Sequence, residues 1–152
     1  MRRREKAVTD SAGLESILWE GRICQLAIPD LPVPYIVTLN YGYRNGTLYF
    51  HSAPEGHKIT LLRQGGPVAF TVAVDRGIVE AEAACNWGTR FRSVVGYGRV
   101  EFLAAQEEKR EALKVLMAQY ADREFEFPEN AIAGTTVFRL VIEEMTGKES
   151  RV

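Results

Sequence analysis

The dipeptide Asn45-Gly46 is the feature that most constrains how this chain can fold. Asn and Gly both tolerate positive φ, so the pair is typical of a tight turn between two antiparallel strands. The segments on either side of it, residues 34–43 and 47–51, are rich in β-branched and aromatic residues. The sequence therefore predicts a β-hairpin at this point and antiparallel pairing for both of its strands.

Four other segments have the alternation or the residue types of strands. They are residues 22–29, 68–74, 91–103 and 136–146. Apolar residues at helical spacing predict helices from Thr9 or Asp10 to about Gly21, over 57–63 and over 106–120. Between residues 75 and about 90 no regular pattern is evident, which predicts a long irregular connection.

Six strands with antiparallel hairpins and few helices favour a closed or nearly closed β-barrel flanked by helices over a βαβ sheet. Gly96 and Gly98 lie on one face of their strand, which suits a barrel corner or the close approach of a ligand or another backbone. The chain of 152 residues is predicted to form one domain over 9–148, with a basic tail at 1–8 and a short tail at 149–152.

Composition excludes several classes of partner. A net charge of -1 gives none of the basic surplus typical of proteins that bind nucleic acid, and no apolar run is long enough to cross a membrane. The basic start is followed by Thr9-Asp10-Ser11 rather than by an apolar segment, so we expect a cytoplasmic protein. Two isolated cysteines and two histidines match no metal-ligand spacing, so no metal site is expected, and Cys24 is predicted to lie in the core.

The densest set of chemically useful groups lies in residues 49–58. Ser52 at a strand end, a Gly-containing turn and Lys58 at the start of a helix have the makings of a phosphate cradle. The alternative is an ordinary strand-to-helix turn in which Ser52 caps the helix and Lys58 is solvated. His51 is suited to proton transfer near neutral pH, or is a hydrogen-bonded structural group.

Residues 85–98 form a second informative stretch. Arg90 and Arg92 are candidates to pair with an anion, Ser93 to hydrogen-bond it, and Trp87 to cover an aromatic ring. In the alternative interpretation Trp87 plugs the barrel end and both arginines are solvated.

Three segments together resemble a known family. Residues 34–43 (PYIVTLNYGY), the run from Leu48 to Lys58 and residues 92–98 (RSVVGYG) are similar to the FMN-binding split-barrel proteins. Within that group they most resemble the nitroimidazole-resistance branch related to pyridoxamine 5'-phosphate oxidase, over roughly residues 9–148. The resemblance implies a mainly β, six-stranded antiparallel split barrel with flanking helices, assembled as a homodimer with one FMN in each of two grooves between subunits.

The resemblance also implies roles for particular positions. The backbone of the second strand, at Val37, Thr38, Leu39 and Asn40, would run along the edge of the isoalloxazine ring. Ser52 and Lys58 would hold the phosphate, and His51 would lie near the flavin as the catalytic candidate for substrate or proton handling. Arg92, Ser93 and Trp87 would complete the site. The sequence departs from pyridoxamine phosphate oxidases in lacking their fuller set of phosphate-binding Arg and Lys residues.

These implications lead to an expected function. The protein would be a flavin-dependent oxidoreductase that takes electrons from NAD(P)H and reduces a small acceptor, such as a nitroaromatic compound or a quinone. The chain has no GxGxxG motif, so the nicotinamide would bind only transiently on the exposed flavin face. Two alternatives remain open at this point, a non-catalytic flavin or haem binder and a reductase that uses deazaflavin, because a fold alone does not decide function.

Overall fold

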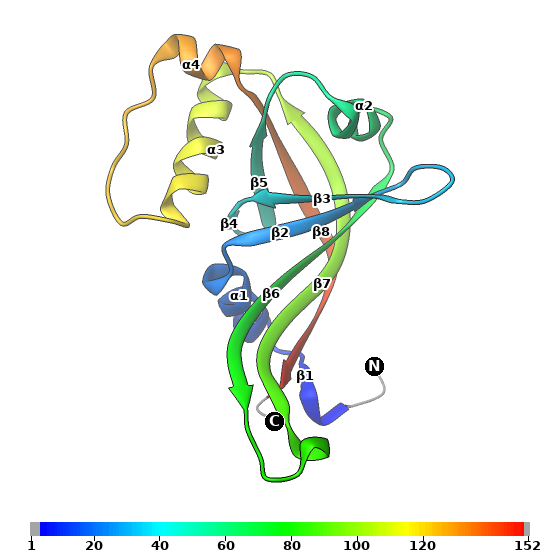
Figure 1. Cartoon of the computed structure of the whole chain (residues 1–152). Coiled ribbons are helices and arrows are strands. Elements are labelled where there is room, and N and C mark those ends of the chain that lie inside the picture. Colours follow the sequence, from blue (N-terminus) through cyan, green and yellow to red (C-terminus); the bar gives the residue numbers. More distant parts are fainter. Residues whose placement is uncertain (1–3, 151–152) are drawn as a thin grey trace.

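The computed structural model describes residues 4–150, and its central element is one antiparallel sheet that curves into a barrel (Figure 1). The strands are β1 (Ala7–Val8), β2 (Ile23–Ile28), β3 (Tyr35–Asn40), β4 (Gly42–Arg44), β5 (Thr47–Ser52), β6 (Pro67–Val79), β7 (Gly88–Leu103) and β8 (Thr136–Ser150). The α-helices are α1 (Ser11–Glu20), α2 (His57–Arg63), α3 (Gln106–Ala118) and α4 (Glu129–Gly134), and two 3-10 turns are η1 (Arg4–Lys6) and η2 (Ala84–Asn86). The predicted class, a mainly β antiparallel barrel with flanking helices, is confirmed.

The barrel closes through a bend in the second predicted strand. The strand order is β3-β2-β6-β7-β8-β5-β4, with the short β1 added beside β8. β3 and β4 therefore stand at opposite ends of the sheet although only Tyr41 separates them in the chain. The sequence predicts one strand over 34–43, and the structure divides it in two, which together with β1 accounts for eight strands where six were expected.

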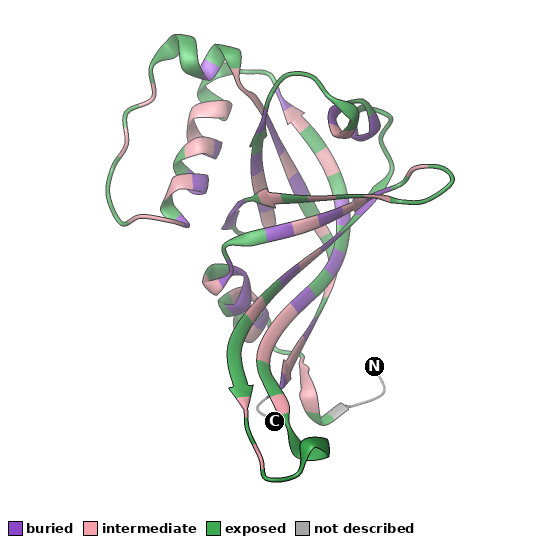
Figure 2. Ribbon diagram, in the orientation of Figure 1, coloured by how far each residue is buried: buried purple, intermediate pink, exposed green. Residues whose placement is uncertain are grey.

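Two helices supply apolar side chains to the core. Leu14, Ile17 and Leu18 of α1 are buried, as their spacing predicts, and Asp10 caps this helix by accepting a hydrogen bond from Gly13 N at 2.8 Å. The predicted bounds of α2 are confirmed, and its buried residues join the same cluster as those of α1. Along the strands, buried and exposed positions alternate, and Figure 2 shows the buried positions as purple bands.

Gly96 and Gly98 are required by the barrel interior. A Cβ at Gly96 would lie 2.4 Å from Glu144 O and 2.7 Å from the Phe70 ring, and one at Gly98 would lie 2.0 Å from Val141 O. Neighbouring backbone and core side chains thus occupy the space. Of the alternatives open from the sequence, the structure therefore supports a barrel corner with close backbone approach, and no ligand is needed to explain these glycines.

The predicted irregular segment over 75–90 is wrong. β6 continues to Val79 and pairs with β7 from Gly88 onward, so only residues 80–87 connect the two strands. A bulge interrupts the pairing between Asp75 and Ile78, where Gly77 has a φ of 93° and donates its N–H to Asp75 Oδ1 at 2.8 Å. The polar and glycine residues that suggested a loop therefore form a bulge inside a long hairpin.

Strands reach into the sequence near both ends of the described residues. Ala7 and Val8 of β1 pair with Lys148 and Gly147, and β8 extends to Ser150, so strands enter both segments that the sequence predicts as tails. Residues 1–3 and 151–152 of those predicted tails lie outside the described residues. Within residues 4–150, no helix is long and apolar enough to cross a membrane. The cytoplasmic location stays a prediction.

The two cysteines lie in different environments. Cys24 is fully buried, as predicted, and burial raises the pKa of its thiol to about 12. Cys85 is exposed at the tip of the β6–β7 hairpin. Both thiols are free.

Candidate functional site

The free edge of β3 is the first component of the candidate site. β3 is hydrogen-bonded to β2 only, and among the described strands none pairs with its other edge. An antiparallel strand directs alternate backbone groups to opposite edges, so part of the N–H and C=O groups of β3 remain available. Val37 and Leu39 pack against the core, whereas Thr38 and Asn40 are exposed. The four residues expected along the isoalloxazine edge thus lie on a strand with unpaired backbone groups.

Ser52, at the end of β5, carries a buried hydroxyl that lacks a partner. Its Oγ accepts and donates no hydrogen bond among the described residues. The alternative in which Ser52 caps α2 is wrong, because the residue at the start of that helix is Gly56 and no side chain caps it. A buried hydroxyl without a partner is unfavourable and calls for an explanation, such as a bound group that supplies the missing hydrogen bond.

Lys58 lies in the first turn of α2, six residues after Ser52, and is half-buried. No ion pair or hydrogen bond to its ammonium group is found within residues 4–150. The neighbouring His57, in contrast, is held in place, since its Nε2 lies 2.8 Å from Asp30 Oδ2 and its ring packs edge-on against Tyr35 at 4.9 Å. Lys58 is therefore an uncompensated cation on a helix that is anchored to the start of β3.

The contact between His57 and Asp30 was not predicted from the sequence. The hydrogen bond from His57 lowers the pKa of the Asp30 carboxyl, and a bond from Leu31 N adds to this effect. Asp30 lies in the Pro-rich connection between β2 and β3, where the sequence shows only turn signals. No local pattern distinguishes a carboxylate that reaches a distant helix from one that is merely solvated.

His51 lies beside Ser52 but points the other way. Its side chain is exposed on the outer face of β5, whereas the flanking Phe50 and Ser52 are buried. No described residue hydrogen-bonds its imidazole ring. This divergence follows from the period of two along a strand. His51 is thus accessible to a molecule outside the barrel.

The outer face of the sheet carries an apolar groove of about 300 Å³. Its lining residues come from β2, β3, β6 and β7, and they are Gln25, Ala27, Ile36, Ala69, Phe70, Thr71 and Val95. Ile36 is 66% exposed and Val95 is 53% exposed. Large apolar side chains gathered on a face in this way are typical of a surface that a ligand or another protein covers.

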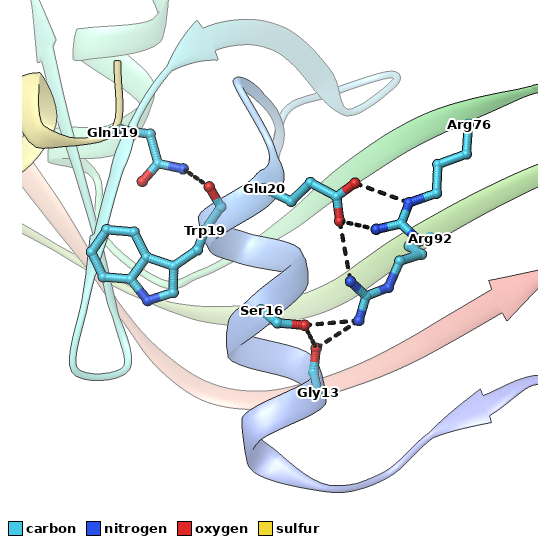
Figure 3. Close-up of polar contacts among 7 residues, drawn as sticks. All are labelled: Gly13, Ser16, Trp19, Glu20, Arg76, Arg92 and Gln119. Carbon is cyan, nitrogen blue, oxygen red and sulfur yellow. Dashed lines mark hydrogen bonds and ion pairs between the residues drawn. The ribbon is translucent and has the colours of Figure 1, made fainter. Parts of the chain in front are cut away.

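The guanidinium group of Arg92 is hydrogen-bonded to residues of α1, as Figure 3 shows. Its guanidinium group donates to Glu20 Oε2 at 3.1 Å, to Ser16 Oγ at 2.8 Å and to Gly13 O at 3.4 Å. Arg76 donates to the same Glu20 carboxylate at 2.9 Å and 2.7 Å. The alternative of a solvated side chain is therefore wrong for Arg92, whose anion is a carboxylate of α1. A role for Arg92 in cofactor binding stays a prediction, and this geometry favours a structural one.

The Glu20 cluster leads to a first prediction. Hydrogen bonds from Arg76 and then Arg92 lower the pKa of Glu20 below its ordinary value of 4.5. Its charge therefore stabilises the fold fully above about pH 4.5, and this contribution is lost as the pH falls through the lower pKa of the folded state. We expect Glu20→Gln to reduce the free energy of unfolding by about 1 kcal/mol at pH 7 and to have less effect at pH 3.

Urea unfolding of both proteins at the two pH values measures this effect. Glu111→Gln is the matched control, because Glu111 pairs with Lys114 on the exposed side of α3 and should contribute less. Equal unfolding free energies of wild type and Glu20→Gln at pH 7 would show that the cluster does not hold α1 to the hairpin.

The remaining predicted site residues lie along the β6–β7 hairpin. Trp87 is 50% exposed at its tip, where the indole Nε1 donates to Ala81 O at 2.7 Å. Ser93 is half-buried on β7, between Ala73 of β6 and Lys148 of β8, and Arg90 is exposed. Figure 1 shows the hairpin tip at the opposite end of the molecule from α2. Within one chain, α2, which carries Lys58, contacts the start of β3 through His57 and Tyr35, and β3 lies near β5, which carries His51 and Ser52. Trp87 lies away from these elements (Figure 1).

Comparison with known proteins places this geometry in context. The family model described as pyridoxamine 5'-phosphate oxidase matches residues 10–149. Among curated protein sequences, none matches the chain significantly. A solved structure from Bacteroides thetaiotaomicron, described as a candidate 5-nitroimidazole antibiotic resistance protein, is 35% identical, with a TM-score of 0.84 over 94% of this chain and 86% of that one.

Two structures of lower sequence identity share the fold. A flavocytochrome from Azotobacter vinelandii is 23% identical, with a TM-score of 0.85 over 100% of this chain and 72% of that one. A protein from Mycobacterium smegmatis described as binding FAD and haem is 22% identical, with a TM-score of 0.86 over 97% of this chain and 74% of that one. The family match covers nearly the whole barrel, including the free edge of β3, Ser52 and Lys58, and this chain belongs to the pyridoxamine 5'-phosphate oxidase family.

Proposed function

We propose that this protein binds FMN and acts as a flavin-dependent oxidoreductase that reduces a small acceptor. The observation that carries the proposal is the buried Ser52 hydroxyl without a partner, six residues from the uncompensated Lys58. A phosphate monoester would satisfy both groups at once, because its oxygens accept hydrogen bonds and carry the opposite charge. This donor set fits the phosphate end of FMN.

The rest of the cofactor has a matching surface. The unpaired edge of β3 offers backbone donors and acceptors to a polar ring edge, and the apolar groove on the outer face suits a flat ring system. When bound, FMN would supply the electron transfer that no side chain of this chain provides. The residues of the chain would bind the phosphate, orient the ring and limit the access of water.

We further propose that two copies of the chain form the complete site. The exposed Ile36 and Val95 lie on the face that carries the groove, and covering them with a second copy would remove them from water. In such a dimer, Trp87, Arg90 or Ser93 of one chain could approach the β3 edge of its partner. Sedimentation of the purified protein measures its mass, and a protein that stays monomeric with FMN present would contradict the dimer.

A nitroaromatic compound is the acceptor class that we propose first, with transient NAD(P)H as the electron donor. The 35% identical structure from Bacteroides thetaiotaomicron, with its description as a 5-nitroimidazole resistance protein, supports this choice. A quinone is the second class, because its reduction also needs only an accessible flavin face. Steady-state assays with a nitroimidazole and with a quinone, each with NAD(P)H, distinguish the two.

The absorption spectrum of the purified protein is the decisive experiment. The two visible bands of an oxidised flavin, and tight binding of added FMN, would support the proposal. A sharp Soret band would favour the haem-binding alternative, and binding of deazaflavin in place of FMN would favour the deazaflavin alternative. A colourless protein that binds none of these would overturn the proposed function.

For His51 we expect a selective effect on turnover. The imidazole is exposed and has no partner among the described residues, so its loss should leave the fold and FMN affinity within about twofold of wild type. If it delivers a proton to the reduced acceptor, His51→Ala should lower kcat by about a hundredfold. His51→Gln retains hydrogen bonding but not proton transfer and should be equally slow. Turnover of either variant at the wild-type rate would show that His51 has no catalytic role.

A further inference from the structure

The bend at Tyr41 determines where β3 lies. Gly42 and Tyr43 of β4 pair with Tyr49 and Leu48 of β5. In an antiparallel ladder each step back along one strand is a step forward along the other, so an unbent strand would place Asn40 opposite His51. Leu39 would then lie opposite Ser52. The bend therefore prevents β3 from pairing with β5 at His51 and Ser52, which belong to the candidate site.

Tyr120, which follows α3, hydrogen-bonds the bend and the end of β3 that precedes it. Its hydroxyl oxygen accepts from Tyr41 N at 3.0 Å and from Asn40 Nδ2 at 3.2 Å, and it donates to Arg22 O at 2.5 Å. One hydroxyl group thus joins the end of β3, the bend itself and the residue before β2. Each of these segments is about 80 or more residues away in the chain.

Gln119 holds the other side of the bend. It is buried, and its Oε1 accepts from Tyr43 N of β4 at 3.3 Å. Its Nε2 lies 2.9 Å from Leu18 O, 3.0 Å from Trp19 O (drawn in Figure 3) and 2.8 Å from Gly21 O, so the same side chain caps the end of α1. The four contacts fix Gln119 against two separate segments, β4 and the end of α1.

The backbone of α3 also packs directly on the bend. A Cβ at Gly42 would lie 2.5 Å from Leu116 Cα and 2.5 Å from Val115 O. Tyr41 itself is fully buried, and its hydroxyl donates to Leu18 O at 2.5 Å. The bend therefore lies between the end of α1 and the end of α3, with side-chain acceptors for its N–H groups at Tyr41 and Tyr43.

We propose that Gln119 and Tyr120 are positioning residues for the flavin site: they lock the bend and so keep the edge of β3 open beside His51 and Ser52. The inference rests on the proposed function for the identity of the ligand. Its structural part concerns the bend alone and is tested without a cofactor. Loss of the Tyr120 hydroxyl would leave the Tyr41 N–H buried and without its acceptor, which favours local rearrangement of the strand.

Tyr120→Phe tests the inference, with Tyr43→Phe as the matched control. The Tyr43 hydroxyl accepts from Gly46 N at 3.1 Å and also contacts the side chain of Glu15 in α1, so its removal disturbs the β4–β5 turn and this contact but no hydrogen bond of Tyr120. Hydrogen exchange of the apo proteins should show the amides of residues 39–43 exchanging at least tenfold faster in Tyr120→Phe than in wild type. The Tyr43→Phe control should leave the amides of residues 39–41 unchanged.

FMN titration and the reduction potential of the bound flavin supply the second readout. In Tyr120→Phe we expect the Kd for FMN to rise about tenfold and the reduction potential to shift. In Tyr43→Phe, at comparable thermal stability, the Kd should stay within twofold of wild type and the potential should be unchanged. Should Tyr120→Phe not fold, Asn40→Ala supplies the test, because it removes the Nδ2 contacts to the Tyr120 hydroxyl at 3.2 Å and to Arg22 O at 3.4 Å while the Tyr41 N–H keeps its acceptor. It is expected to act in the same direction with a smaller effect.

The outcomes separate the two proposals. Unchanged exchange at residues 39–43 in Tyr120→Phe would overturn the role of Tyr120 in holding the bend. Equal FMN affinity and potential in Tyr120→Phe and wild type would overturn the positioning role and leave the proposed function standing. If the wild-type protein binds no FMN, the proposed function and the positioning role are both overturned. Faster exchange in Tyr120→Phe would still confirm that Tyr120 holds the bend.

Discussion

Replacing Lys58 by alanine is expected to weaken FMN binding by about tenfold to a hundredfold, because charge-assisted hydrogen bonds are worth about 1.5–3 kcal/mol. The ammonium group has no partner among the described residues, so its removal should leave the unfolding free energy of the apo protein nearly unchanged. A fluorescence titration of FMN measures the affinity. The affinity should also become less dependent on salt, since one ionic contact to the phosphate is lost.

Lys114→Ala is the matched control for this prediction. Lys114 is an exposed lysine on α3 that pairs with Glu111, and it is not part of the candidate site. The control should bind FMN as the wild type does. If Lys58→Ala binds FMN as tightly as Lys114→Ala, Lys58 is not the phosphate cation.

Ser52→Ala provides a complementary signature of the same site. Removing a buried hydroxyl that lacks a partner should leave the apo protein as stable as wild type or slightly more stable. The same variant should bind FMN more weakly, because the phosphate loses a donor. Reduced stability without a change in FMN affinity would identify Ser52 as a structural residue.

The largest effect on stability is expected for Gly98→Ala. The added Cβ would lie 2.0 Å from Val141 O and 2.8 Å from Leu140 Cδ2, and the first of these atoms belongs to the backbone of the neighbouring strand. β7 and β8 would have to separate at the point where their register already shifts. We expect a loss of about 3 kcal/mol or more in the free energy of unfolding, the upper end of the cost of overpacking.

Gly134→Ala is the control with the same chemical change. A Cβ at Gly134 meets no atom within 4 Å, and this glycine ends α4. Its unfolding free energy should therefore stay close to that of wild type in a urea titration. A Gly98→Ala protein as stable as the Gly134→Ala protein would mean that the strands yield at the bulge at little cost.

Local patterns predicted most of the secondary structure for identifiable reasons. Asn45-Gly46 specified the hairpin turn, where both residues have positive φ, and the spacing of Leu14, Ile17 and Leu18 predicted the buried face of α1. Over 106–120 the apolar residues at helical spacing, Leu113, Leu116, Met117 and Tyr120, predict the buried face of α3 only in part, because the buried set is Ala112, Val115 and Leu116. α3 contacts β4 and β5, and the backbone of Val115 and Leu116 lies directly against Gly42 of β4, a contact that the local pattern does not predict.

The candidate site was predicted only where its residues are close in sequence. The fragment from His51 to Lys58 could be recognised because strand, turn and helix follow one another directly. Asp30, Gln119 and Tyr120 were not predicted, because their contacts join residues 27 to 101 positions apart. Nothing in the local pattern around α3 indicates that the residues just after it hydrogen-bond a bend in the first third of the chain.

The sequence by itself determined the strands, the hairpin turn, the helices α1 and α2 and the opposite directions of His51 and Ser52, since these follow from periods of 2 and 3.6 residues and from φ preferences. Only the tertiary structure decided that Tyr41 divides a strand, that Arg92 pairs with Glu20 and that the Ser52 hydroxyl is left without a partner. Those outcomes depend on which distant groups the closed barrel brings within hydrogen-bonding distance, and a linear pattern carries no record of such distances.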